Sequence, residues 1–528
     1  MSLVSTGFLL FLLAGVIVYY IIPKKMQWVW LLVLSCFYYL CSGYKTIIFI
    51  ITTTIVTYFA GVFLNKENER IKNIPAQADR SEKKKIKEDV KRRKKLIVAL
   101  LLVIIFGILA VIKYHTFAIE NINAVIGVFT GKYDTIPTFK LLLPLGISFY
   151  TFQSAGYIID VYRDKYECCN NIFKFALFVS FFPQIMQGPI GRYDRLSPQF
   201  NEPHYFSLEN TEYGLQLMLW GFFKKIVIAD RIGVVADKVF LHPYDYNGIF
   251  VIVGVLAYCL QLYADFSGGM DVVSGAAELY GIKLDKNFRQ PFFSKSIGEF
   301  WRRWHITLGT WMKDYIFYPM SLSKGMNKLS KWGKKHLGNH LGRTLPICFA
   351  NLVIFFIVGI WHGAEVRYIA YGLYNGIIIA FSNLCEPIYK KGLEKFRING
   401  DGRGWKIFKI IRTFILVNIG WIFDCCELGM RTAVKMMTEM FTKLNVQLLT
   451  WDIFKQFELK PKDYIVIAVG CVVIFIVGIF KEKGIKIRET IASKPLAVRW
   501  LLYYGIIILA LLFGYTDSGS SGFMYAAF

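Results

Sequence analysis

The sequence contains little charge. Only 19% of its 528 residues are charged, whereas 55% are apolar and the mean hydropathy is +0.43. This composition excludes a soluble globular enzyme, in which about a quarter of the residues are charged. Apolar runs long enough to cross a bilayer recur from Gly7 almost to the C-terminus. We therefore expect a single large membrane domain over residues 1–528.

Several catalytic and metal-binding motifs are also missing. The sequence has no GxSxG elbow, no Walker A pattern, no HExxH and no dinucleotide-binding fingerprint, which argues against nucleotide hydrolysis as an energy source. Its ten cysteines form no metal-like CxxC pair, and we interpret them as buried thiols. The first apolar stretch has neither a basic region before it nor a cleavage site after it, which predicts a retained first span.

Acidic residues are scarce relative to basic ones, because 62 Lys and Arg face 37 Asp and Glu. Four basic stretches between apolar runs carry 22 of the 25 excess charges. This arrangement is typical of cytoplasmic loops, and it favours a membrane surface over a nucleic-acid partner. The resulting orientation predicts both termini outside the cell, and residues 65–95 form the expected basic, helix-prone cytoplasmic loop. The four stretches are 66–95, 324–343, 386–412 and 481–499.

Apolar segments of nearly bilayer-spanning length predict an all-α, polytopic integral membrane protein with about 11–13 transmembrane or re-entrant helices. Strict alternation of these spans would place the basic stretch 286–303 outside the cell, although basic stretches are expected on the cytoplasmic side. We therefore expect at least one central segment to be re-entrant or to lie in the interface. The segments are 7–23, 27–43, 46–64, 96–113, 141–161, 172–190, 212–230, 248–264, 346–361, 366–384, 408–424, 463–480 and 498–514.

Two of the seven histidines lie in unusual places. His305 stands in the Trp- and Tyr-rich stretch GEFWRRWHITLGTWMKDYIFYP, and His362 ends an apolar run in IVGIWHGAEVRYIAYGLYNG. An ionisable group at membrane depth is costly, so it faces a cavity or a partner, or makes a structural hydrogen bond. Trp361 and Gly363 give His362 a bulky wall on one side and a point of close backbone approach on the other. Imidazole, with an unperturbed pKa of about 6.5, suits deprotonation of a hydroxyl at neutral pH.

Four segments carry a resemblance to a known family: QGPIGRYDRLSPQF, YADFSGGMDVVSGAAELYGIKLDKNFRQPF, SIGEFWRRWHITLGTWMKDYIFYP and IWHGAEVRYIAYGLYNG. In them the chain resembles the membrane-bound O-acyltransferases, in particular the branch of the alginate and peptidoglycan O-acetyltransferase membrane subunits. The resemblance implies catalytic core segments over 187–376, followed by C-terminal helices over 405–528. It also implies that His362 is the principal catalytic residue and that His305 is a second active-site residue.

The resemblance implies a reaction as well. In a bacterial cell membrane, acetyl-CoA would be the donor substrate from the cytoplasm, with no bound cofactor and no metal. The acceptor would be an extracytoplasmic polysaccharide, reached through an exported acetyltransferase of the serine-hydrolase (SGNH) type. His362 would act as general base, while His305 orients the thioester or the acceptor and stabilises developing charge. The alternatives are D-alanyl transfer of the teichoic acid type and a transporter without covalent chemistry. The basic stretch 324–343 is the expected cationic mouth for the phosphates of CoA.

Further residues of these segments are predicted to bind substrate. Arg302 and Arg303 could pair with phosphate or with Asp314, or extend to the interface. Asp265 could orient a histidine or cap a helix. The tryptophans of the motifs could line a tunnel or form an interface belt, and Tyr525 near the C-terminus could relay an acyl group, dock a partner or simply pack. The predicted substrate-binding residues are Arg302, Arg303, Trp304, Trp361, Asp314, Tyr315 and Asp265.

Overall fold

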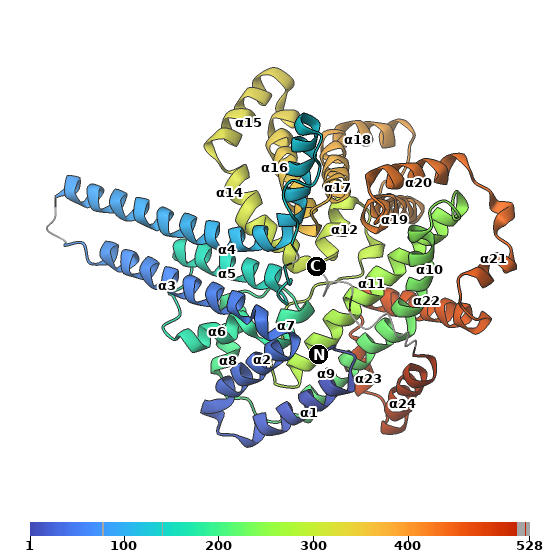
Figure 1. Ribbon diagram of the computed structural model, residues 1–528, viewed down its shortest axis with the longest axis horizontal. Coiled ribbons are helices and arrows are strands. Elements are labelled where there is room, and N and C mark those ends of the chain that lie inside the picture. The colour runs from blue at the N-terminus through green and yellow to red at the C-terminus, as the bar shows by residue number, and fades with distance from the viewer. Residues whose placement is uncertain (76–78, 140, 515–522, 524–528) are drawn as a thin grey trace. The chain divides into compact units, whose positions relative to one another are not determined.

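The computed structural model describes residues 1–75, 79–139, 141–514 and 523. Every regular element within these residues is a helix, which confirms the all-α class. The chain divides into two compact units, the first formed by 1–215 with 273–285 and the second by 216–272 with 286–528. We describe each unit by itself, with the elements labelled as in Figure 1.

The first unit is built around α5, in which 14 of the 16 residues are buried. Its helix α3 extends past the predicted apolar segment to Lys72, and α4 begins at Arg80 and runs for 51 residues. Most of the basic stretch 66–95 is therefore helical, as its composition predicts. The helices are α1 (Thr6–Ile21), α2 (Gln27–Gly43), α3 (Ile47–Lys72), α4 (Arg80–Thr130), α5 (Ile147–Tyr162), α6 (Ile172–Ser180), α7 (Phe182–Gln187), α8 (Tyr193–Asn201) and the start of α9 (Leu208–Phe222).

The second unit contains the remaining helices, including most of α11, whose last turns belong to the first unit. Two π-helical segments, η3 (Phe223–Ala229) and η5 (Lys313–Phe317), interrupt its longer helices. The α-helices are α10 (Asp230–Leu241), α11 (Ile249–Glu278), α12 (Ile297–Arg303), α13 (Ile306–Met312), α14 (Tyr318–Ser321), α15 (Lys324–Leu337), α16 (Asn339–His362), α17 (Val366–Leu384), α18 (Glu386–Lys395), α19 (Arg403–Cys425), α20 (Met430–Thr442), α21 (Trp451–Gln456), α22 (Pro461–Glu482), α23 (Ile487–Ala492) and α24 (Leu496–Phe513).

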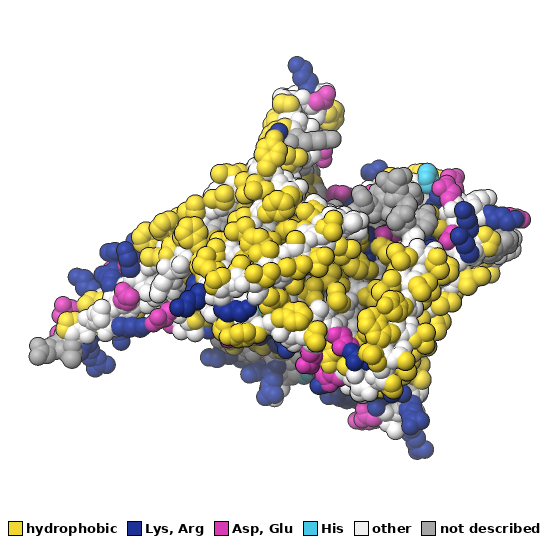
Figure 2. All heavy atoms as spheres, turned by 90° about the horizontal axis from the view of Figure 1, so that it is seen from below, with side chains coloured by type: hydrophobic (Ala, Val, Ile, Leu, Met, Phe, Trp, Pro, Cys, Tyr) yellow, Lys and Arg dark blue, Asp and Glu magenta, His cyan; other side chains and the backbone are white. Residues whose placement is uncertain are grey.

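Six helical stretches of the described residues are long and apolar enough to cross a bilayer, or seven if the bent pair α17 and α18 forms one span. The other predicted segments form helices that are shorter or interrupted, as at residues 172–187, except 408–424, which lies within the 23 residues of α19. The expected number of 11–13 counted re-entrant helices together with transmembrane ones, so it includes these shorter and interrupted helices. Large apolar side chains are exposed along many of the helices, and Figure 2 shows one such surface. These features are those of a multi-pass membrane protein. The six stretches are 24–72, 80–130, 249–278, 339–362, 461–482 and 496–513.

The segment α12, which ends the basic stretch 286–303, lies beside two other basic stretches. Arg303 pairs with Glu482 at 2.7 Å, and the guanidinium of Arg412 donates to the carbonyl of Lys295 at 2.9 Å. Strict alternation of the predicted spans would separate these groups by the width of a bilayer. Their contact therefore favours a position of 286–303 on the same side of the membrane as the other basic stretches. It also supports a re-entrant or interfacial segment in the centre of the chain.

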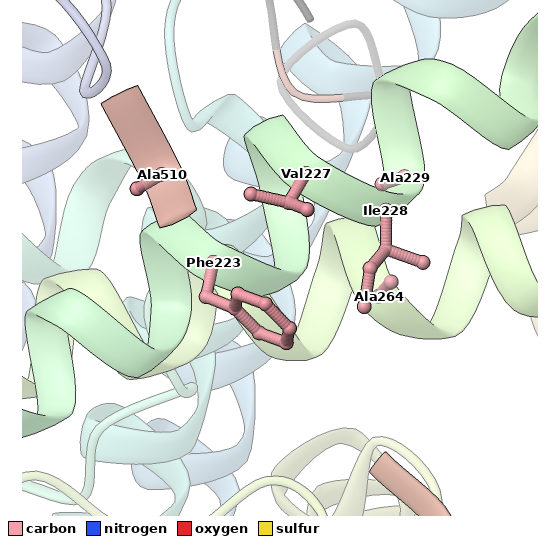
Figure 3. Close-up of a cluster of buried hydrophobic side chains, with 6 residues drawn as sticks. All are labelled: Phe223, Val227, Ile228, Ala229, Ala264 and Ala510. Carbon is pink, nitrogen blue, oxygen red and sulfur yellow. The ribbon is translucent and has the colours of Figure 1, made fainter. Parts of the chain in front are cut away.

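The π-helix η3 is held by a small apolar cluster. Its side chains pack against Ala264 of α11 and Ala510 of α24 (Figure 3). The two lysines of η3 are buried and each contacts a carboxylate of α11: Lys224 pairs with Asp271 at 2.6 Å, and Lys225 with Asp265 at 2.6 Å. The cluster consists of Phe223, Val227, Ile228, Ala229, Ala264 and Ala510.

Candidate active site

His362 is the last residue of α16, at the turn into α17. The two helices form an antiparallel hairpin, because at its other end the ring of His340 contacts the carbonyls of Asn383 and Leu384 at 3.2 and 3.3 Å. At the His362 end, a Cβ on Gly363 would clash with the ring of Tyr368. The close approach expected at Gly363 is therefore present, and it brings an aromatic ring of α17 beside His362.

His305 occupies the sharp turn between α12 and α13. Its φ of 46° and ψ of 52° lie in the left-handed region, which is uncommon for a residue other than glycine. The amide oxygen of Asn287 holds this turn, because it accepts hydrogen bonds from the backbone N–H of Thr307 at 2.9 Å and from its hydroxyl at 3.0 Å. Backbone strain of this kind is found at functional sites, where the surrounding structure enforces it.

Asn287 also selects the tautomer of His305. Its amide oxygen lies 3.3 Å from Nδ1 of His305. Because an amide oxygen only accepts hydrogen bonds, this contact requires the proton of the neutral imidazole to be on Nδ1. Nε2 then carries the lone pair and can accept a hydrogen bond, but it cannot donate one.

The two histidines lie on either side of Trp361. Its ring centroid is 5.9 Å from that of His305 and 5.1 Å from that of His362. Burial lowers the pKa of His305 to about 3, and the charge of a protonated His362 would lower it further. His305 is therefore a neutral ring at physiological pH. When one of the two buried imidazoles is protonated, its charge opposes protonation of the other, so the pair carries at most one added proton.

A carboxylate that the sequence interpretation missed also faces this pair. Oδ1 of Asp424, near the end of α19, lies 3.8 Å from Nδ1 of His362. Tyr258 of α11 donates its hydroxyl proton to Oδ2 of Asp424 at 2.7 Å. The signal in the sequence was an acidic residue at the end of a predicted apolar span, where charge is costly. Its proximity to His362 depends on the packing of α19 against α17.

Of the predicted aromatic substrate-binding residues, Trp361 and Trp304 lie near the histidines. Trp361 separates the two rings as described. Trp304 is buried, and Phe266 connects it to His305, with ring centroids 6.3 and 5.0 Å away. Tyr315 is also buried, 5.0 Å from Trp311 in ring centroids. These contacts place the tryptophans in the protein interior rather than in an interface belt.

The charged residues behave differently from the predictions. Arg303 is buried and pairs with Glu299 at 2.8 Å and with Glu482 at 2.7 Å, so the predicted pairing of Arg303 with Asp314 is wrong. Its neighbour Arg302 is exposed, because successive residues of α12 point in different directions. Asp314 is half-buried in η5.

Asp265 lies in the interior of α11, so the helix-cap interpretation is wrong. Its carboxylate pairs with the ammonium of Lys225, which also contacts Asp230 at 2.8 Å. A buried carboxylate needs such a partner, because desolvation is costly for an unpaired charge. Tyr525 lies outside the described residues.

Comparisons with known proteins match the part of the chain that carries this geometry. Residues 169–423 match the family model of MBOAT, the membrane-bound O-acyltransferase family. The part of the chain that holds both histidines, just under half of its length, is therefore similar to this family. The matched residues include both histidines and Trp361, but they stop one residue before Asp424.

Named relatives agree with this family. A probable alginate O-acetylase of Pseudomonas syringae pv. tomato is 36% identical over 63% of this chain and 58% of its own length. A peptidoglycan O-acetyltransferase of Helicobacter pylori is 30% identical over 63% of this chain and 62% of its own length. A teichoic acid D-alanyltransferase of Bacillus subtilis is 29% identical over 54% of this chain and 69% of its own length. The chain thus spans about three fifths of the length of the first two relatives.

Proposed function

We propose that the protein is a membrane O-acetyltransferase, which moves an acetyl group from cytoplasmic acetyl-CoA toward an extracytoplasmic polysaccharide. The observation that carries the proposal is the placement of His305 and His362 on either side of Trp361, buried within the segment that matches the family. The relatives that act on alginate or peptidoglycan support a polysaccharide acceptor. The acceptor would be reached through an exported SGNH-type acetyltransferase.

In the proposed reaction His362 is the general base. It takes the proton of the acceptor hydroxyl while the hydroxyl oxygen forms a bond to the acetyl carbon. The carbon–sulfur bond of the thioester breaks, and the proton passes from His362 to the departing thiolate. The relay requires His362 to be neutral before each turnover and to be hidden from bulk water, and its side chain is 7% exposed.

The role proposed for His305 is narrower than the one drawn from the sequence. With the Nδ1 proton directed at Asn287, Nε2 of His305 is an acceptor. An acceptor nitrogen cannot stabilise a developing oxyanion, so charge stabilisation by His305 does not fit this tautomer. It can accept a hydrogen bond from another N–H or O–H group of a bound substrate, because the proton of the reacting hydroxyl goes to His362, and we assign it the orientation of that substrate.

The position that we propose for the phosphates of the donor also differs from the basic stretch 324–343 predicted from the sequence. Gly333 of α15 packs on Gly342 near the start of α16, whereas His362 ends that helix. The 22 residues from His340 to His362 correspond to about 33 Å of helix. The basic residues at the Gly333 end of α15, Lys331, Lys334 and Lys335, therefore lie far from His362, which argues against a CoA mouth at this end of the stretch 324–343.

Cationic groups beside α12 are better placed for the donor. Arg302 is exposed three residues before His305, and Arg412 of α19 contacts the backbone of Lys295. Arg412 and Asp424 are separated by about 18 Å along α19, a length of the order of an extended pantetheine arm. We propose that Lys295, Arg302 and Arg412 receive the phosphates while the thioester reaches His362.

The proposal is tested with purified full-length protein in nanodiscs, by following release of free CoA from acetyl-CoA in the presence of a hydroxyl acceptor. We expect turnover by the wild type, its loss in His362→Ala, and wild-type turnover in His336→Ala. His336 is a suitable control because it is exposed on α15, away from the site. Equal turnover in His362→Ala and wild type would remove the catalytic assignment. Turnover of a D-alanyl carrier thioester but not of acetyl-CoA would instead favour the activity named for the Bacillus subtilis relative.

A further inference from the structure

We propose that Asp424 is the positioning residue for His362: its carboxylate holds the imidazole with Nδ1–H toward Oδ1, so that Nε2 is presented to the reacting hydroxyl. The inference rests on the proposed function, because it assigns a residue to that reaction. It concerns a part of the chain beyond the matched segment, in the last turn of α19.

The first argument is geometric. Nδ1 of His362 and Oδ1 of Asp424 are 3.8 Å apart, and their side chains are only 7% and 5% exposed. This separation is longer than a hydrogen bond. Contacts between a catalytic base and its orienting group are often long in a substrate-free protein and shorten in the complex with substrate. A small rotation of either side chain would close the gap.

The second argument is that Asp424 is itself held in place. Its Oδ2 accepts the hydroxyl proton of Tyr258 at 2.7 Å, and its backbone carbonyl accepts a hydrogen bond from Arg367 at 2.6 Å. Arg367 is buried and its guanidinium also pairs with Glu365 at 2.7 Å. Helices α11 and α17 therefore both fix the end of α19, and the carboxylate is pre-organised for a third partner.

The third argument concerns the oxygen that remains. Oδ1 of Asp424 is buried and accepts no hydrogen bond from the residues that the structure describes. A buried carboxylate oxygen without a hydrogen-bond donor is costly, because its desolvation is not compensated. A purely structural link between α11 and α19 would need only the bond from Tyr258, whereas the free oxygen faces the ring of His362. A base oriented by a buried carboxylate is the arrangement that activates hydroxyl nucleophiles in unrelated enzymes.

Asp424 is the carboxylate that faces His362, so its charge influences the protonation of that ring. Other described groups near His362 include the ring of Trp361, the phenols of Tyr368 and Tyr371 on α17, and the neutral ring of His305. The pair of Arg367 and Glu365 is neutral overall, and Arg367 contacts the carbonyl of Asp424 and the hydroxyl of Tyr368. Loss of the negative charge at Asp424 would therefore leave His362 neutral to lower pH.

The kinetic test compares Asp424→Asn, Asp424→Glu and Tyr258→Phe with the wild type in nanodiscs. Asp424→Asn should lower kcat on the order of 100-fold or more, with little change in KM for acetyl-CoA. In the pH profile of kcat/KM for Asp424→Asn, the fall on the acid side should move to lower pH. Asp424→Glu, which keeps the charge, should recover part of kcat. Tyr258→Phe keeps the charge of Asp424 but loosens its carboxylate, so it should lower kcat less than Asp424→Asn does. Glu427→Gln, which removes an exposed carboxylate three residues away, should behave as the wild type.

A second readout does not require turnover. The rate of diethyl pyrocarbonate modification of His362, followed by mass spectrometry as a function of pH, reports the protonation of the ring directly. We expect the midpoint to lie at lower pH in Asp424→Asn and to be unchanged in Glu427→Gln. An unchanged midpoint in Asp424→Asn, or a loss of activity that merely parallels lost thermal stability, would overturn the proposal. If Asp424→Asn does not fold, Tyr258→Phe decides the matter through kcat: a lower kcat at unchanged thermal stability supports the proposal, and wild-type kcat would overturn it. If the wild type does not consume acetyl-CoA, the proposed function fails, while the modification profile still tests the link between Asp424 and His362.

Discussion

Asn287 accepts two hydrogen bonds from Thr307, one from the backbone N–H and one from the hydroxyl, and thereby closes the turn at His305. His305 lies between α12 and α13 in a left-handed conformation that only its surroundings can maintain. The backbone N–H of Ile306 adds a third bond, to the carbonyl of Asn287 at 3.0 Å. The position of one active-site ring therefore depends on a residue 18 places earlier in the chain.

Substitution of Asn287 should affect catalysis through the position of His305. Asn287→Ala removes the acceptor for Thr307, and we expect at least a tenfold lower kcat together with a lower melting temperature. Asn287→Asp keeps an acceptor oxygen, so the turn and most of the melting temperature should survive. Steady-state kinetics and thermal unfolding of both variants check this. Wild-type kcat in Asn287→Ala would show that the turn does not position His305.

The hairpin beside His362 should tolerate no side chain at Gly363. A Cβ there would overlap the ring of Tyr368, and overpacking of this kind costs about 1–3 kcal/mol. We expect Gly363→Ala to lower both melting temperature and turnover. The matched control is Gly392→Ala in α18, where a Cβ would meet nothing within 4 Å. Comparable loss of turnover in the two variants would contradict the close packing at Gly363.

The donor site should depend on Arg412 rather than on α15. Arg412→Ala should raise KM for acetyl-CoA severalfold and change kcat less, because a phosphate contact made in both the ground state and the transition state is lost. A triple variant of α15, Lys331→Ala, Lys334→Ala and Lys335→Ala, should leave KM unchanged. The reverse pattern would return the cationic mouth to residues 324–343. Increasing salt should raise KM in the wild type more than in Arg412→Ala.

The buried ring of His305 should make the folded protein sensitive to acid. An unfolded chain protonates this ring near its ordinary pKa of 6.5, whereas burial lowers the pKa in the folded protein to about 3. Protonation therefore favours unfolding: the stability contributed by the neutral ring is full above pH 6.5 and is lost progressively as the pH falls toward 3. Melting temperatures between pH 8 and pH 4 should fall less steeply in His305→Asn than in the wild type. Parallel curves would contradict a neutral, buried His305.

The helices and the two histidines could be predicted from the sequence, because both depend on local patterns. The segment 366–384 was predicted with the bounds of α17, and hydropathy also located α2 and α22 to within a few residues. His362 stood out because it combines an ionisable ring with the end of an apolar run. A signal of this kind needs no knowledge of the tertiary structure.

The partners of these residues could not be predicted in the same way. Asp424 meets His362 from 62 residues away, and Asn287 meets His305 through a turn that hydropathy does not describe. The sequence left open whether Asp265 orients a histidine or caps a helix, and it lies inside α11, where the buried Lys225 pairs with its carboxylate. Ion pairs between distant segments depend on packing, and one sequence contains no direct record of it.

The most direct test of the account places donor and acceptor on opposite sides of a membrane. Proteoliposomes holding the purified protein would contain labelled acetyl-CoA inside, with the exported acetyltransferase and a polysaccharide acceptor outside. The account predicts label on the outer acceptor with the wild type and with His336→Ala, and none with His362→Ala. Label transfer that persists in His362→Ala, or that requires donor and acceptor on the same side, would contradict it.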